Sequence, residues 1–161
     1  DFVVKAKFRV HQGDSGFYFR AKRVKSGRSL SPSSIASTAA RQGQEHIPHY
    51  SASKAAVVSW TQSNALQLAR YDINVNSVCP GYLWTPMWER LAHFRTAFHM
   101  TPSDTGRTGR EFFEDLVESS VPMKKEQTPE DVGNLTAFLV SDDAHNITGQ
   151  AINVDGGRRM N

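Results

Sequence analysis

The stretch IASTAARQGQEHIPHYSASKAAVVSWTQSNALQLARYDINVNSVCPGYLWTP, residues 35–86, decides the fold. Its centre is HYSASKAAV, in which Tyr50 and Lys54 stand four positions apart, and Ser37 lies 13 positions before Tyr50. Residues four apart lie on the same face of a helix, so both side chains can point into one cleft. A free phenol has a pKa of about 10, and a nearby ammonium favours the phenolate. The pair therefore predicts a proton-transfer site, although the same spacing also occurs on solvated helix faces.

The surrounding residues resemble the short-chain dehydrogenase/reductase family. The matching features are Ser37 after a short apolar stretch, the YxxxK pair, and INVNSVCPG followed by Thr85. The resemblance continues through VPM (121–123), TPEDV (128–132) and GQAINVDGG (149–157). It covers residues 35–157 and only the C-terminal part of the family. It implies an α/β fold, the C-terminal part of a Rossmann-type, doubly wound parallel sheet, preceded here by a short β-hairpin.

The resemblance also implies a role for each matching residue. Tyr50 would be the general acid/base, Ser37 would bind the substrate oxygen, and Lys54 would lower the pKa of Tyr50 and hold the nicotinamide ribose. The loop against the nicotinamide would be formed by Pro80, Gly81, Leu83 and Thr85, so the expected cofactor is NAD or NADP. The reaction would interconvert a secondary alcohol and a ketone. The strings ASTAARQG, YSASKAAV and CPG…TPMW look like those of members that act on polyols and sugars, and a fatty or steroid alcohol is the alternative.

The glycine-rich turn of a dinucleotide site is missing from this sequence. A dinucleotide fold needs such a turn between its first strand and helix, where the backbone approaches the pyrophosphate. No two glycines stand at positions i and i+2 with one residue between them, so neither GxGxxG nor the family's GxxxGxG is present. The family's upstream catalytic Asn is also absent, because the first Asn is Asn64. We therefore expect impaired activity and weak NADH binding. Because the chain begins with Asp1, we expect a fragment, a processed product or a fusion.

The first residues have a different pattern. Apolar and basic residues alternate over 4–11, QGDSG follows at 12–16, and alternation resumes over 17–22, which predicts a β-hairpin. This segment looks like a hairpin of the jelly-roll domains typified by 3-keto-disaccharide hydrolases. The Ser-rich residues 25–34 are typical of a linker. We therefore expect three parts: a foreign hairpin (1–24), a junction (25–34) and a partial dehydrogenase domain (35–161).

Composition limits the classes of partner. Residues 1–30 carry eight Lys/Arg against two Asp/Glu, whereas 31–161 carry eleven against fourteen. A basic hairpin with Phe17, Tyr18 and Phe19 permits nucleic-acid binding, but a strand with one solvated face explains the same residues, so no nucleic-acid partner is expected. A single cysteine, Cys79, excludes an internal disulfide and suits the cytoplasm. No run of 18 apolar residues or signal-like segment is present, so no membrane association is expected.

The same patterns predict the remaining elements. We expect a buried strand ending at 35–36, a helix over 51–70, a strand over 73–79, an apolar helical stripe over 86–100, a helix around 111–119 and a last strand over 151–154. Thr128 and Asp131 form a capping box with Pro129 at the first helical position. His46 and His49 lack the further ligands of a metal site, so we expect no metal.

Three functional hypotheses remain open at this stage. The first is an oxidoreductase that acts on a small-molecule alcohol or ketone, as a homo-oligomer. The second is a non-catalytic remnant that at most self-associates through the helix bearing Tyr50, which packs at a subunit interface in the family. The third is a fragment of a carbohydrate-acting jelly-roll protein.

Overall fold

The computed structural model describes residues 18–19, 31–97 and 106–160. They contain a four-stranded sheet in the order β1-β2-β3-β4. The strands are β1 (Tyr18–Phe19), β2 (Ser33–Ile35), β3 (Asn76–Pro80) and β4 (Ala151–Val154). Strands β2, β3 and β4 are parallel, with Ile35 opposite Val78 and Val78 opposite Ile152, while β1 is antiparallel to β2. The predicted α/β fold with a parallel sheet is confirmed.

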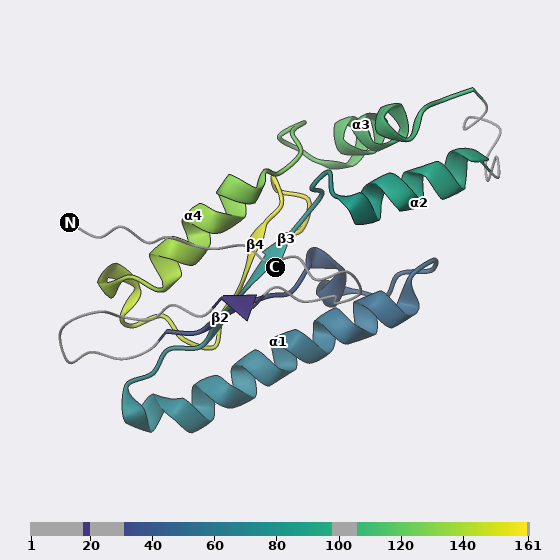
Figure 1. Ribbon diagram of the computed structural model, residues 1–161. Helices are drawn as coiled ribbons and strands as arrows, with labels where there is room; N and C mark the ends of the chain where they lie inside the picture. The colour runs from purple at the N-terminus through teal and green to yellow at the C-terminus, as the bar shows by residue number, and fades with distance from the viewer. Residues whose placement is uncertain (1–17, 20–30, 98–105, 161) are drawn as a thin grey trace.

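Helices cover both faces of this sheet (Figure 1). Helix α1 (Pro48–Leu68) lies along one face and α4 (Pro129–Leu139) along the other. Helices α2 (Pro86–Ala97) and α3 (Gly109–Ser120) lie together beyond the end of β3. Short 3-10 turns are η1 (Thr38–Arg41), η2 (Ala69–Tyr71) and η4 (Asp142–Ala144). The result is a three-layer α/β arrangement with a pair of helices at one end.

The apolar core lies between the sheet and α4. Strand residues Ile35 and Val78 pack against Val132 and Leu139 of α4, and all four are buried. Parallel strands covered on both faces need apolar residues on the face that meets a helix. Val132 and Leu139 are buried on one face of α4, and Leu135 packs beside them. The predicted capping box is also present: Thr128 accepts from the Asp131 backbone, and Asp131 accepts from the Thr128 backbone.

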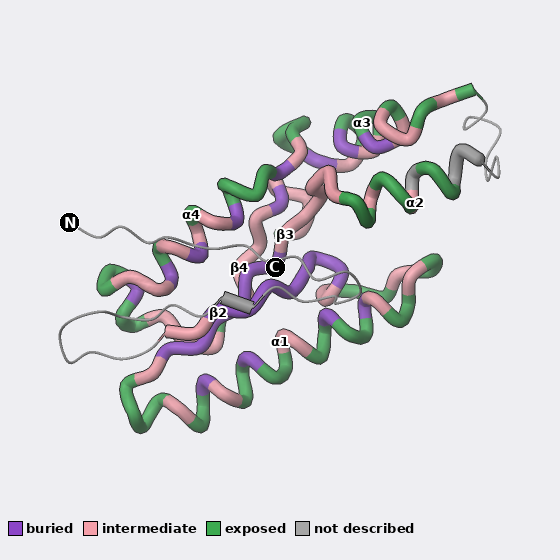
Figure 2. Tube along the Cα trace, viewed as in Figure 1, coloured by how far each residue is buried: buried purple, intermediate pink, exposed green. Residues whose placement is uncertain are grey.

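Small and polar side chains fill the other interface, between the sheet and α1. Ser34 and Thr61 are both buried, and their hydroxyl oxygens lie 3.4 Å apart. Ser77 of β3 stands opposite Ser34 in the sheet and is buried, as is Ala65 of α1. Figure 2 shows short buried stretches at intervals along α1. Because none of these side chains is long, α1 can approach the strands closely. The periodicity of large apolar residues therefore does not mark the buried face of this helix.

Two element boundaries differ from the sequence-based prediction. Helix α1 begins at Pro48 rather than residue 51, since proline suits the first helical turn, where its missing N–H costs no hydrogen bond. Strand β3 begins at Asn76 rather than residue 73. The reason is that the Asn74 side chain donates to the carbonyls of Ala144 and His145, and the Val75 N–H donates to Thr148 Oγ1. These residues are held by loop contacts instead of the strand ladder.

Most of the predicted N-terminal hairpin lies outside the described residues. What is described is β1, in which Tyr18 pairs with Ser34 and Phe19 with Ser33. The last two residues of the predicted junction, Ser33 and Ser34, therefore belong to the sheet. The likeness to a jelly-roll hairpin and the division into three parts stay predictions.

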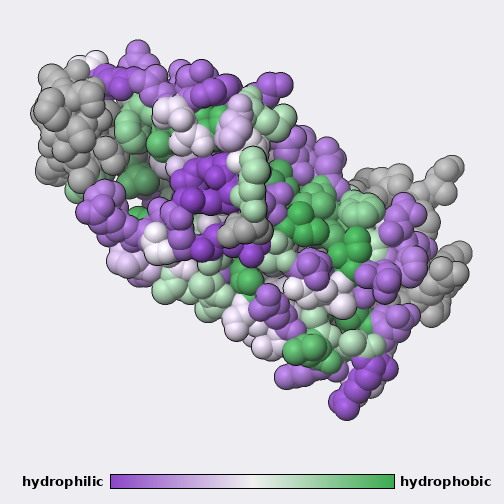
Figure 3. Space-filling view, turned by 180° about the vertical axis from the view of Figure 1, so that it is seen from behind, coloured by the Kyte–Doolittle hydropathy of each residue, from purple (hydrophilic) through white to green (hydrophobic). Residues whose placement is uncertain are grey.

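Several large apolar side chains are exposed on the surface. Figure 3 shows separate hydrophobic patches among polar groups on the face seen from behind. Among the described residues, no helix is both long and apolar enough to span a bilayer. The exposed large apolar side chains are Trp60, Leu66, Tyr71, Met87, Phe94, Met123, Phe138 and Met160.

The cap of α4 gives a direct test of this arrangement. We expect Thr128→Ala to lower the free energy of unfolding by about 1 kcal/mol, because it removes the hydroxyl that accepts from the Asp131 N–H. Urea titration followed by circular dichroism measures the change. The matched control is Thr128→Ser, which keeps the hydroxyl and should be close to the parent. Equal stability of the Ala and Ser variants would contradict the role of this cap.

Candidate active site

Ser37 lies at the carboxyl end of β2, at the start of a tight turn. Its backbone is extended, and its Oγ accepts a hydrogen bond from the Ala39 N–H at 3.1 Å, so Ser37 caps η1. The turn is attached to the next strand, because the Ala36 N–H donates to the Val78 carbonyl at 2.8 Å. Ser37 is buried, and its side chain acts on the Tyr50 phenol in the direction that lowers the pKa of Tyr50.

Helix α1 brings Tyr50 and Lys54 to the same place. Tyr50 stands in the first turn of the helix, and Lys54 lies one turn further, with its Nζ 5.7 Å from the centre of the Tyr50 ring. Lys54 is only 3% exposed, and its Nζ donates to the Ile35 carbonyl at 3.1 Å. The three residues predicted to be catalytic, Ser37, Tyr50 and Lys54, are therefore brought together.

The pKa of Tyr50 shifts in the direction opposite to the one expected from the sequence. Burial raises the pKa of the Tyr50 phenol above its usual range, and the hydrogen bond with Ser37 lowers it only in part. Burial also lowers the pKa of Lys54. The expectation of a lowered phenol pKa omitted the loss of hydration on burial, which disfavours the charged form of both groups.

The predicted cofactor loop follows β3 at the same edge of the sheet. Gly81 donates to the Val154 carbonyl at 2.9 Å, and Leu83 packs against the core cluster of Ile35 and Val78. Thr85 directly precedes α2: its carbonyl accepts from the Glu89 N–H and its hydroxyl from the Trp88 N–H. The loop thus starts at Pro80, where β3 ends. Because the carboxyl ends of parallel strands meet at one edge, this loop and the Ser37 turn are neighbours.

Close packing under Gly81 explains why a glycine stands there. A Cβ at this position would lie 2.5 Å from Gln127 Oε1 and 2.9 Å from the Asp155 Cα. Gln127 and Asp155 are both buried, and Gln127 Oε1 has no hydrogen-bond partner among the described residues. The Asp155 carboxylate accepts from the Gly157 and Arg159 N–H groups at 3.1 and 2.8 Å. The turn formed by residues 155–159, which we call the C-terminal turn, therefore packs against the loop at Gly81.

The helices α2 and α3 are joined by aromatic side chains. Phe113 of α3 is fully buried and makes edge-on contacts with Trp84 and Trp88, whose ring centres lie 5.1 and 5.2 Å from its own. Tyr82 contacts Trp88 in the same way, at 5.2 Å. The apolar residues predicted around 86–100 and 111–119 thus pack together here, as far as the described residues extend.

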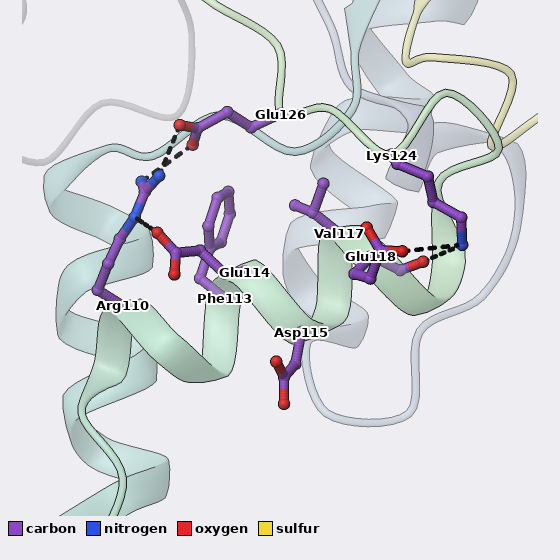
Figure 4. A pocket seen from close by; sticks show the side chains of 8 residues that line it. All are labelled: Arg110, Phe113, Glu114, Asp115, Val117, Glu118, Lys124 and Glu126. Atoms are coloured by element: carbon purple, nitrogen blue, oxygen red, sulfur yellow. Dashed lines mark hydrogen bonds and ion pairs between the residues drawn. The ribbon is translucent and has the colours of Figure 1, made fainter.

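A hollow of about 340 Å³ lies on the outer side of α3 (Figure 4). Phe113 and Val117 form its apolar wall, while Arg110 bonds to Glu114 and Glu126, and Lys124 lies near Glu118. The hollow is lined by none of the predicted catalytic residues. The ion pairs of Arg110 with Glu126 and of Lys124 with Glu118 connect α3 to the segment that follows, while Asp115 pairs with Arg107 outside the lining.

Among the described residues, no group of three or more His, Cys, Asp or Glu side chains could hold a metal ion. His46 and His49 are both exposed.

Comparison with known proteins identifies the family. Residues 21–159 match the model of a family described as Enoyl-(Acyl carrier protein) reductase. The chain belongs to the short-chain dehydrogenases/reductases. It is 40% identical over 124 residues to the granaticin polyketide synthase putative ketoacyl reductase 1 of Streptomyces violaceoruber, covering 76% of this chain and 43% of the relative. It is 39% identical over 127 residues to galactitol 2-dehydrogenase of Agrobacterium fabrum, covering 78% and 46%.

A solved structure agrees with this assignment. The F189W actinorhodin polyketide ketoreductase, determined with NADPH, superposes with a TM-score of 0.70 at 35% identity, covering 81% of this chain and 47% of that one. This dehydrogenase chain therefore spans under half the length of the curated relatives it matches.

Sequence reasoning missed several residues that build this site. Arg41 extends from the Ser37 turn to β4, and Gln127 lies under Gly81. Nothing in the spacing of either residue marks it, because both act through contacts between segments far apart in the sequence. Asp155 lies within the quoted GQAINVDGG string, so this string was the sequence signal that could have identified it. In the structure its carboxylate accepts from two backbone N–H groups.

Gly81 gives a test of the packing under the loop. We expect Gly81→Ala to destabilise the protein by about 1–3 kcal/mol, because the new methyl group would meet the Asp155 backbone. The matched control is Gly43→Ala, because a Cβ at Gly43 meets nothing within 4 Å and its backbone does not require a positive φ. Urea unfolding of the two variants measures the difference. Equal stability of the two variants would refute the close packing.

Tyr50 gives a test of the site's electrostatics. We expect Ser37→Ala to raise the pKa of Tyr50 further, because it removes the hydrogen bond that favours the phenolate. NMR titration of protein labelled with ¹³Cζ-tyrosine measures this pKa directly. The control is Ser53→Ala, since the Ser53 hydroxyl bonds to the Tyr50 backbone carbonyl instead of the phenol. A Tyr50 titration unchanged by Ser37→Ala would show that the two side chains are not coupled.

Proposed function

We propose that this chain carries the catalytic half of an NAD(P)-dependent oxidoreductase that interconverts a secondary alcohol and a ketone. The observation that supports it is the meeting of Ser37, Tyr50 and Lys54 at the carboxyl ends of β2 and β3. A phenol, an ammonium and a hydroxyl at this edge have the donor and acceptor chemistry to handle an alcohol oxygen. The relatives that act on galactitol and on ketoacyl groups support the same reaction.

Tyr50 would move the proton. In oxidation, the Tyr50 phenolate would take the proton from the substrate O–H while the carbon loses a hydride, and in reduction the phenol would return that proton. The buried Lys54 ammonium would stabilise the phenolate, and the Ser37 hydroxyl would bond to the substrate oxygen. NAD(P), when bound, supplies the hydride acceptor or donor.

The residues present fit the nicotinamide end of this cofactor. The loop of Pro80, Gly81, Leu83 and Thr85 is half-buried beside the Ser37 turn. Because the Leu83 side chain packs against the core, the loop backbone would be free to contact the planar nicotinamide ring. Tyr50 and Lys54 would contact the ribose. The solved relative bound to NADPH supports this assignment. A polyol or sugar is the proposed substrate, supported by the likeness to galactitol 2-dehydrogenase.

A homo-oligomer in the cytoplasm is the proposed state. Trp60 and Leu66 are 55% and 83% exposed on α1, and apolar side chains at these positions support self-association. The same observation favours the second candidate, a non-catalytic chain that only self-associates through α1. The single free cysteine, which is buried, supports a cytoplasmic location.

Turnover tests the assignment. We expect the chain, co-expressed with the first half of the galactitol dehydrogenase relative, to reduce ketones with NADPH, and Tyr50→Phe to abolish this turnover because it deletes the transferred proton. Absorbance of NADPH follows the reaction. The matched control is Tyr71→Phe, which changes an exposed tyrosine on η2. Normal turnover by Tyr50→Phe would remove Tyr50 from the mechanism, and no turnover by any pair of halves would favour the non-catalytic candidate.

Cofactor affinity is a separate prediction for the chain alone. We expect weak or no NADH binding in a fluorescence titration, because its sequence contains no glycine-rich turn for the pyrophosphate. Deleting residues 1–30 should leave any residual affinity unchanged apart from a salt-sensitive part due to their basic charge. Micromolar affinity, or a loss on deletion that does not depend on salt, would overturn this expectation.

A further inference from the structure

The last residue of the Ser37 turn reaches across the sheet to its last strand. Arg41 ends η1, and its guanidinium donates to Asn153 Oδ1 at 3.3 and 3.4 Å and to the Ala151 carbonyl. Arg41 and Asn153 are 112 residues apart in the sequence. Core packing does not account for this contact, because both residues are polar and only partly buried.

Asn153 passes the contact on to the C-terminal turn. Its Nδ2 donates to the Arg159 carbonyl at 2.9 Å, and the Arg159 N–H donates to the Asp155 carboxylate at 2.8 Å. Asp155 in turn lies directly under Gly81. A continuous set of hydrogen bonds and contacts thus connects the turn that carries Ser37 with the loop that begins at Pro80.

Cys79 lies near the Ser37 turn and can serve as a probe of its position. It stands opposite Asn153 in the sheet and is fully buried. Burial raises the pKa of the Cys79 thiol, and the nearby charge of Arg41 partly offsets this effect. Residues of η1 contact β3, so we expect release of the turn to expose the thiol.

We propose that Arg41 and Asn153 are positioning residues that hold the Ser37 turn against β4, and thereby keep the Ser37 hydroxyl in hydrogen-bonding contact with Tyr50. A charged donor shared between a side-chain amide and a backbone carbonyl fixes the turn in one orientation. The inference rests on the proposed function, in which Ser37 and Tyr50 act on the substrate. Its readouts use the chain without cofactor or substrate, so a failure of turnover leaves them unaffected.

The first readout is the pKa of Tyr50, measured by ¹³Cζ-tyrosine NMR on the full chain. We expect Asn153→Ala to raise this pKa in the same direction as Ser37→Ala, although it removes no charge. In a Ser37→Ala background, Asn153→Ala should add nothing, because its effect passes through the Ser37 hydroxyl. The matched control is Gln150→Ala, since the Gln150 amide donates to a nearby group, the Thr148 carbonyl. An unchanged pKa in Asn153→Ala, or an equal rise in the Ser37→Ala background, would overturn the proposal.

The second readout is the labelling rate of Cys79, the single cysteine of the chain. We expect Arg41→Met to accelerate labelling by a thiol reagent by about tenfold under native conditions, because loss of a charged hydrogen bond favours local opening of the turn. Arg90→Met, on α2, is the matched control for loss of an arginine. If Arg41→Met fails to fold, Arg41→Lys should show smaller changes in the same two readouts. Labelling of the folded Arg41 variant at the parent rate would show that Arg41 does not hold the turn.

Discussion

The close approach of α1 to the parallel sheet is the constraint on which the candidate site depends. Ser34, Thr61, Ala65 and Ser77 leave little space between helix and strands. Lys54 then lies deep enough for its ammonium to reach the Ile35 carbonyl at the end of β2. With larger side chains in this interface, the helix would stand further away, and neither Lys54 nor Tyr50 would reach the Ser37 turn. This approach also buries both side chains. Burial raises the pKa of Tyr50 and lowers the pKa of Lys54, so it favours the neutral form of each group.

The two faces of the sheet therefore have different roles: one forms the apolar core and the other carries the candidate catalytic residues. Towards α4, branched and aliphatic side chains pack as an ordinary core. Towards α1, the small side chains are polar and can provide hydrogen-bond partners for buried groups near Tyr50 and Lys54. The aromatic contacts of Phe113 with Trp84 and Trp88 hold α2 and α3 as a separate pair beyond the strands.

Much of the fold could be predicted from local signals, because those signals act over a few residues. The capping box at Thr128, the last strand over Ala151–Val154 and the helix with Tyr50 and Lys54 on one face are all of this kind. The start of β3 could not be predicted, since it depends on Asn74 bonding to carbonyls about 70 residues away. The direction of the Tyr50 pKa also required the structure, because burial is a property of the whole fold. The contact of Arg41 with Asn153 has no sequence signal for the same reason.

Strand β1 affects whether a further chain can pair with the edge of the sheet. A parallel strand with a bare edge offers unpaired N–H and C=O groups on which another chain can add. Here two residues, Tyr18 and Phe19, occupy the edge of β2 in the antiparallel sense. This pairing covers the edge of β2 at Ser33 and Ser34, where another chain could otherwise add. The contact that adds β1 to the sheet thus also protects this part of β2 from the strand addition that leads to fibrillar aggregates.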